Sequence, residues 1–160
     1  MLLTDRAHRF GLRPLRYQFP VPGGDSWDDN WLVVAADLAT PSGRWSFTDA
    51  CLLVDEARTM SGWLRAMADG RVPDALPGPE GRRTPDLGFI EPVLAFSQVR
   101  WRDGAGVLRV HLSPEGAPPW QRHEEEADPG PYLVEIETNR TELVRAAEEW
   151  DRELAPFPLR

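Results

Sequence analysis

The chain has 160 residues, of which 41% are hydrophobic and 28% are charged, a composition typical of one globular domain with its own core. Its formal net charge is −8, which argues against direct binding to nucleic acid because phosphates require a positive surface. The single cysteine excludes an internal disulfide, and no apolar run approaches membrane-spanning length, so we expect a cytoplasmic protein that does not bind membranes.

A β-hairpin at residues 31–52 is the predicted centre of the fold. Residues 31–38 are apolar almost throughout, residues 44–52 alternate between apolar and polar, and the segment between them is rich in turn residues. Pairing across this turn sets Leu32 opposite Cys51. The same register gathers one apolar face, which consists of Leu32, Val34, Ala36, Leu38, Trp45 and Phe47.

The rest of the chain is predicted to cover this face. In order, the expected elements are broken strand pieces at 6–19, a helix at 55–70 with Asp55 as N-cap, a loop at 71–86, strands at 87–91, 93–102 and 108–112, a loop at 113–130, a strand at 131–138 and a helix capped by Asn139 or Thr141. In the second hairpin, Val99 faces Leu108 and His111 points outward. We therefore predict an α+β fold in a single domain, 1–160: an antiparallel sheet of about six strands with two helices packed on one side.

Several segments of this chain recur together, in the same order, in a known family. The clearest are Tyr17-Gln18-Phe19-Pro20, Trp27-Asp28-Asp29-Asn30-Trp31-Leu32, Trp45-Ser46-Phe47-Thr48-Asp49, Phe89-Ile90-Glu91-Pro92 and Pro118-Pro119-Trp120. On these residues the chain resembles the WapI-type immunity proteins, which protect a bacterium from the toxic C-terminal domain of a wall-associated or Rhs-type protein. The resemblance covers nearly the whole chain. It implies a non-enzymatic protein that binds and neutralises a cognate toxin domain, possibly a nuclease.

Two predicted loops place tryptophan beside acidic residues, a combination typical of protein interfaces. An acidic surface also suits a basic partner, such as a toxin that must hold phosphate. The candidate partner-binding residues are Asp25, Trp27, Asp28, Asp29, Trp31, Trp120, Glu124, Glu125 and Glu126. The alternative is that the loop tryptophans fold back over the core, where the pattern places Trp45, Trp63, Trp101 and Trp150.

Other candidate sites are weaker. The acidic residues between Asp25 and Asn30 do not follow the spacing of a calcium loop, so we expect Asp28 and Asn30 to bind local backbone instead. None of the three histidines has a partner at metal-ligand spacing, and we expect neither a metal nor a cofactor. Glu91 is the one carboxylate in an apolar run. It leaves open a second reading, a small-ligand-binding protein or an enzyme with a pocket between the sheet and the helices.

Overall fold

The computed structural model describes residues 1–74, 84–121 and 130–160. In the described part, seven strands form two antiparallel sheets, one with the order β1-β2-β3-β4 and the other with the order β5-β6-β7. The elements are β1 (Leu2–Thr4), β2 (Arg9–Tyr17), β3 (Trp31–Thr40), β4 (Gly43–Leu53), α1 (Val54–Ala68), β5 (Leu94–Arg102), β6 (Ala105–Leu112), β7 (Tyr132–Asn139) and α2 (Arg140–Leu154).

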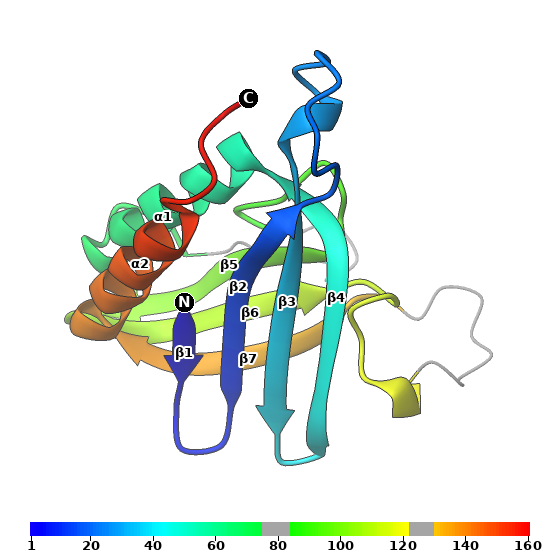
Figure 1. Cartoon of the computed structure of the whole chain (residues 1–160). Coiled ribbons are helices and arrows are strands. Elements are labelled where there is room, and N and C mark those ends of the chain that lie inside the picture. The colour runs from blue at the N-terminus through cyan, green and yellow to red at the C-terminus, as the bar shows by residue number, and fades with distance from the viewer. Residues whose placement is uncertain (75–83, 122–129) are drawn as a thin grey trace.

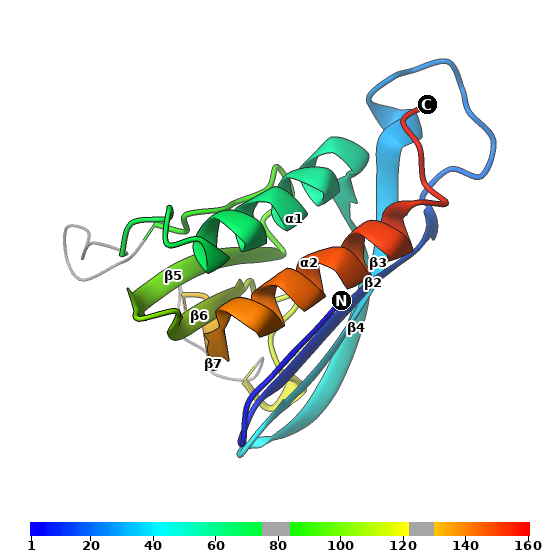
Figure 2. The same cartoon turned by 90° about the vertical axis from the view of Figure 1, so that its left-hand side faces the viewer.

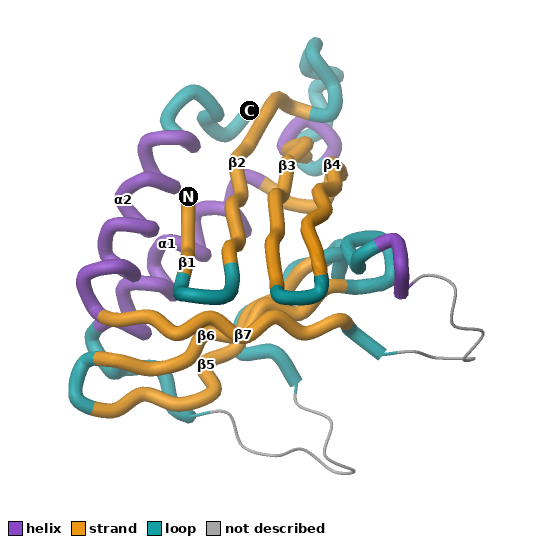
Figure 3. The backbone as a smooth tube through the Cα atoms, turned by 90° about the horizontal axis from the view of Figure 1, so that it is seen from below, coloured by secondary structure: helices purple, strands orange, loops and turns teal. Residues whose placement is uncertain are grey.

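The strands of the two sheets run across each other, and both helices lie on the same side of the four-stranded sheet (Figures 1 and 2). Seen from below, β1 and the β1–β2 turn lie close to β7, where the sheets meet (Figure 3). Buried side chains from all seven strands and both helices form one apolar core. No described helix is both long and apolar enough to cross a membrane.

The predicted α+β class with two helices is confirmed, although the strands number seven rather than about six and divide into two sheets. The three-residue strand β1 was missed because so short a segment carries no periodic signal. The predicted strand at 87–91 is wrong, since only Leu87 bridges to Phe96 there. Alternation along the chain identifies strands, but it does not reveal that α1 separates β4 from β5 and lets them join different sheets.

The central hairpin has the predicted register over most of its length. Leu38 lies opposite Trp45, and Ala36 lies opposite Phe47. Toward the far end, however, a β-bulge makes Cys51 an extra residue in β4, so Leu32 faces Leu52 and the predicted Leu32–Cys51 pair is wrong.

A second bulge shifts the β5–β6 hairpin in the same way. Val99 is the extra residue, and Leu108 faces Gln98, so the predicted Val99–Leu108 pair is also wrong.

The helix ends show which capping signals decide the boundaries. α1 begins one residue before the predicted start because Glu56 turns back and its Oε2 accepts the N–H of Leu53 at 3.0 Å. Leu53, and not Asp55, is therefore the N-cap. Of the two predicted caps of α2, Asn139 and Thr141, Asn139 is the one observed, with its side chain accepting the N–H of Glu142 at 3.1 Å.

Two of the four tryptophans predicted for the core are fully enclosed. Trp150 is completely buried and its Nε1 donates to the carbonyl of Ala57 at 2.6 Å, joining the two helices. Trp45 is 8% exposed and packs edge-on against Tyr132 at a ring separation of 5.5 Å. Trp63 and Trp101 are only partly buried and line the margin of the core.

Candidate partner-binding surface

The loop between β2 and β3 is held in shape by its own carboxylates. Asp29 is buried, and its two oxygens accept the N–H groups of Gly23 at 2.7 Å and Gly24 at 2.9 Å. Asp25 remains exposed while its Oδ1 accepts the N–H groups of Trp27 at 2.8 Å and Asp28 at 3.2 Å. Local backbone binding was predicted for Asp28 and Asn30. It is confirmed for Asn30, whose side chain donates to the carbonyl of Ser26 at 2.6 Å, whereas Asp25 and Asp29 bind the backbone in place of Asp28.

A second set of contacts ties the same loop to the last residues of the chain. The Asn30 side chain donates to the carbonyl of Arg160 at 3.0 Å and accepts the N–H of Arg160 at the same distance. The guanidinium of Arg160 lies 3.4 Å from the centre of the Tyr17 ring, and Tyr17 also donates a hydrogen bond to the carbonyl of Pro158. Residues 18–30 and 157–160 therefore form one ordered unit, which stands at the upper end of the sheet in Figure 1.

This unit exposes several large apolar side chains. Trp27 is 51% exposed and rests edge-on against the half-buried Trp31, with ring centres 6.2 Å apart. Phe19, Val21 and Leu159 are also exposed. We call the exposed large apolar and acidic side chains of this unit the loop surface, which consists of Phe19, Val21, Asp25, Trp27, Asp28 and Leu159.

A sequence model of the immunity protein WapI-like family matches residues 1–158. The chain belongs to this family. No curated protein and no solved structure matches the chain significantly, so the family assignment comes from the sequence model alone.

In this WapI-like protein, the described parts of the two predicted binding loops lie apart. Trp120 lies in a 3₁₀ helix, Pro119–Gln121, and its ring packs against Gly43 at the tip of the β3–β4 hairpin. Trp31 starts β3 at the opposite end of that strand, about 30 Å away at roughly 3.3 Å per residue. Trp120 is 43% exposed, so its ring neither folds back completely over the core nor stands free of the chain. The acidic residues Glu124, Glu125 and Glu126 lie outside the described residues.

His111 lies on the predicted side of β6, opposite Val110 and Leu112, but that side is covered rather than exposed. Its side chain is 5% exposed, and its Nε2 lies in a 2.8 Å hydrogen bond with the hydroxyl of Ser97, which is fully buried. Burial first, and the nearby Arg109 second, lower the pKa of His111 from 6.5 to about 4. Alternation identifies the face of a strand correctly, but it cannot show that this face is covered.

Glu91 is exposed, which removes the reason for reading it as a buried acid or base. Cys51 is buried, and burial, with a smaller contribution from nearby carboxylates, raises the pKa of its thiol to about 12. Such a thiol is a poor nucleophile. Among residues 1–74, 84–121 and 130–160, no three His, Cys, Asp or Glu side chains form a group that could hold a metal ion.

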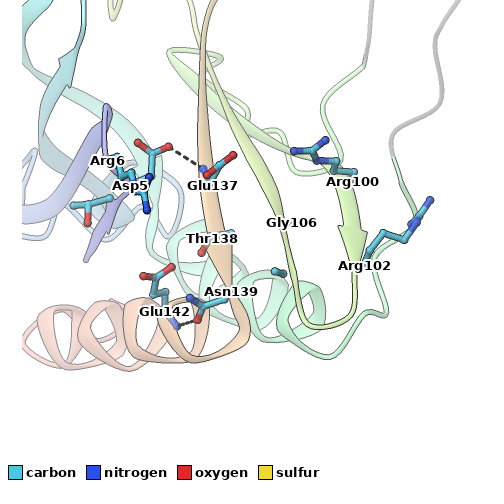
Figure 4. Close-up of a pocket in the computed structure, with 11 residues that line it drawn as sticks. Asp5, Arg6, Arg100, Arg102, Gly106, Glu137, Thr138, Asn139 and Glu142 are labelled. Atoms are coloured by element: carbon cyan, nitrogen blue, oxygen red, sulfur yellow. Dashed lines mark hydrogen bonds between the residues drawn. The ribbon is translucent and has the colours of Figure 1, made fainter.

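One surface pocket lies among the β1–β2 turn, the β5–β6 hairpin and the start of α2 (Figure 4). Charged residues of both signs line it, including Asp5, Arg6, Arg100 and Glu137. Burial raises the pKa of Asp5, but hydrogen bonds from the backbone of Ala7, Glu137 and others outweigh burial and lower it overall. The Asp5 carboxylate is thus engaged in joining the turn to β7, and the mixed lining favours no particular reaction.

Sequence reasoning missed the contribution of the last residues of the chain to this surface. Arg160 shapes the loop surface through Asn30 and Tyr17, and Leu159 adds apolar area. Asn30 and Arg160 are 130 positions apart, so no local pattern pairs them.

Proposed function

We propose that the protein binds and neutralises a cognate toxin domain in the cytoplasm, without catalysis, and that the loop surface is its main contact. One observation carries the location: Trp27 is half-exposed on a loop fixed by its own hydrogen bonds and flanked by exposed carboxylates. Membership of the immunity family supports the role.

The rigidity of the loop matters for affinity. Ordering a flexible loop on binding costs free energy, whereas here Asp29 and Asn30 already hold the backbone in the free protein. An exposed tryptophan on such a support is the side chain most often found as a binding anchor. Asp25 and Asp28 add negative charge beside it, which suits a toxin that carries positive charge to hold nucleic acid.

The second reading, a pocket between the sheet and the helices near Glu91, has less support. The space between these layers is filled by buried apolar side chains of both sheets and both helices. Glu91 itself is exposed. A closed core with exposed aromatic and acidic loops is the arrangement expected of a binding protein rather than of an enzyme.

The test uses a cognate toxin domain, to be sought in the coding region directly upstream of this chain. The purified domain is measured for binding kinetics at two salt concentrations. Trp27→Ala is expected to speed dissociation by about tenfold or more. Trp120→Ala provides a matched comparison, since it removes a similarly exposed tryptophan at the opposite end of the sheet. We expect a smaller effect because the Trp120 ring already packs against the chain.

Charge variants separate the effect of long-range attraction on association from the effect of direct contacts on dissociation. Asp25→Asn with Asp28→Asn should slow association and flatten its salt dependence while leaving dissociation nearly unchanged. Charge reversal of Glu124, Glu125 and Glu126 should act in the same way if the acidic run also faces the toxin. Failure of the parent to bind would refute the proposed function. Normal binding by every loop-surface variant would instead place the interface elsewhere.

A further inference from the structure

The outer face of the four-stranded sheet, turned away from the helices, carries arginine on two of its strands. The strand register puts Arg9 and Arg13 of β2 on the same face as Arg44 of β4. All three are exposed, whereas their chain neighbours Phe10 and Leu12 point into the core. We call Arg9, Arg13 and Arg44 the arginine face.

The surface between these arginines is nearly flat. Ala39 lies directly between Arg9 and Arg44 across three adjacent strands, and a shallow pocket opens above it. Most other positions on this face are small or short, namely Gly11, Ala35, Ser46, Thr48 and Ala50, and the register adds Val33 and Asp37. Short side chains let the backbone or side chains of a partner approach the sheet closely, while the long arginines rise on either side.

Within the described residues, these three arginines have no ion-pair partner, although Asp37 lies on the same face. Some arginines elsewhere on the protein are neutralised, such as Arg65 by Asp151 at 2.6 Å and Arg140 by Asp69 at 3.0 Å. In a chain whose net charge is −8, three exposed arginines outnumber Asp37 on this face, while Glu149 and Glu153 of α2 line a pocket at its edge beside Arg9 and Arg13.

We infer that the arginine face is a second interaction surface, which binds carboxylates on an acidic protein segment. Guanidinium groups match carboxylates with two parallel hydrogen bonds, and the flat floor suits an extended backbone. A nucleic acid fits less well because the net negative charge of the protein repels a polyanion and no aromatic residue lies between the three arginines for base stacking. The loop surface carries the carboxylates of Asp25 and Asp28, so the two surfaces should bind partners of opposite charge.

The test needs no toxin, so its failure is separate from failure of the proposed function. The probe is a short fluorescent peptide of alternating aspartate and serine, titrated with the parent protein at low salt. The variant carries Arg9→Gln, Arg13→Gln and Arg44→Gln. The matched control carries Arg58→Gln, Arg145→Gln and Arg152→Gln, which remove the same charge from exposed positions on the two helices. A single-stranded RNA of equal net charge is the competing probe.

We expect the parent to bind the peptide, the sheet variant to bind about tenfold more weakly, and the helix control to change by no more than about twofold. Equal losses in both variants would show that only net charge matters and would overturn the inference. So would the absence of peptide binding to the parent, or tighter binding of the RNA with the same loss in the sheet variant. Thermal unfolding checks that all variants fold, since exposed substitutions of this kind cost little stability.

Discussion

Mild acid should destabilise this protein because of His111. The imidazole is 5% exposed, and its Nε2 is hydrogen-bonded to the buried hydroxyl of Ser97. Burial and the neighbouring Arg109 lower its pKa from 6.5 to about 4. The folded protein therefore holds the neutral ring, while the unfolded chain takes up a proton as soon as the pH falls below its ordinary pKa.

The sign and size of the effect follow from linkage. Between the two pKa values the unfolded state binds more protons than the folded state, so the free energy of unfolding falls as the pH falls. The contribution is fully present above about pH 6.5 and exhausted below about pH 4, a span worth roughly 3 kcal/mol. From about pH 7 to about pH 5 the expected loss is about 2 kcal/mol.

Urea unfolding at a series of pH values measures this loss directly. His111→Gln is the control because its amide does not titrate and can still reach the Ser97 hydroxyl. The variant should be less stable than the parent near neutral pH, yet it should lose much less stability on acidification over the same range. If the parent and the variant lose the same free energy between about pH 7 and about pH 5, protonation of His111 is not the cause.

The other predictions concern the core, the loop and metals. Trp45→Ala should lower the free energy of unfolding by about 3–5 kcal/mol, since it empties a core position and removes the 2.9 Å hydrogen bond from Nε1 to the carbonyl of Gly116. Phe47→Ala should cost less, about 1–3 kcal/mol, because Phe47 is only partly buried. Asn30→Ala should cost about 1–3 kcal/mol and expose the loop to proteolysis, since it breaks both hydrogen bonds to Arg160. EDTA or Ca²⁺ should leave the thermal midpoint unchanged, because we expect no metal site. A metal ion that bound the native state alone would raise the midpoint.

The sequence predicts those parts of the fold in which local pattern and burial agree. Trp45 and Phe47 alternate with polar residues, and only one register puts both toward the core, so most of the central hairpin could be assigned. Asn139 is both a preferred cap and the first residue before an amphipathic helix, which fixes the start of α2.

The errors arise where a single residue departs from the period. Cys51 and Val99 each add one residue to a strand, and beyond each bulge every predicted pair is displaced. Neither residue has a side chain that demands a bulge, because bulges depend on how the strand fits its neighbours in three dimensions. The burial of His111 was missed for a related reason. Period-two alternation assigns a residue to one face of a strand, but it cannot test whether that face is exposed to solvent.

The candidate site shows the same limit more sharply. Asp25, Asp28 and Asp29 are chemically alike in the sequence, yet only Asp29 is buried, and both its oxygens are committed to the turn at Gly23 and Gly24. A pattern that reads three acids as one cluster therefore assigns to a partner a carboxylate that the loop itself requires.

We expect Asp29→Asn to weaken toxin binding through loss of loop order, and to lower stability as well. Asp28→Asn should change association alone, because its exposed carboxylate only contributes charge. Comparing the two variants for thermal midpoint and for binding kinetics separates the residue that builds the surface from the one that contacts the partner. Similar thermal midpoints for both variants would show that the buried hydrogen bonds of Asp29 do not hold the loop.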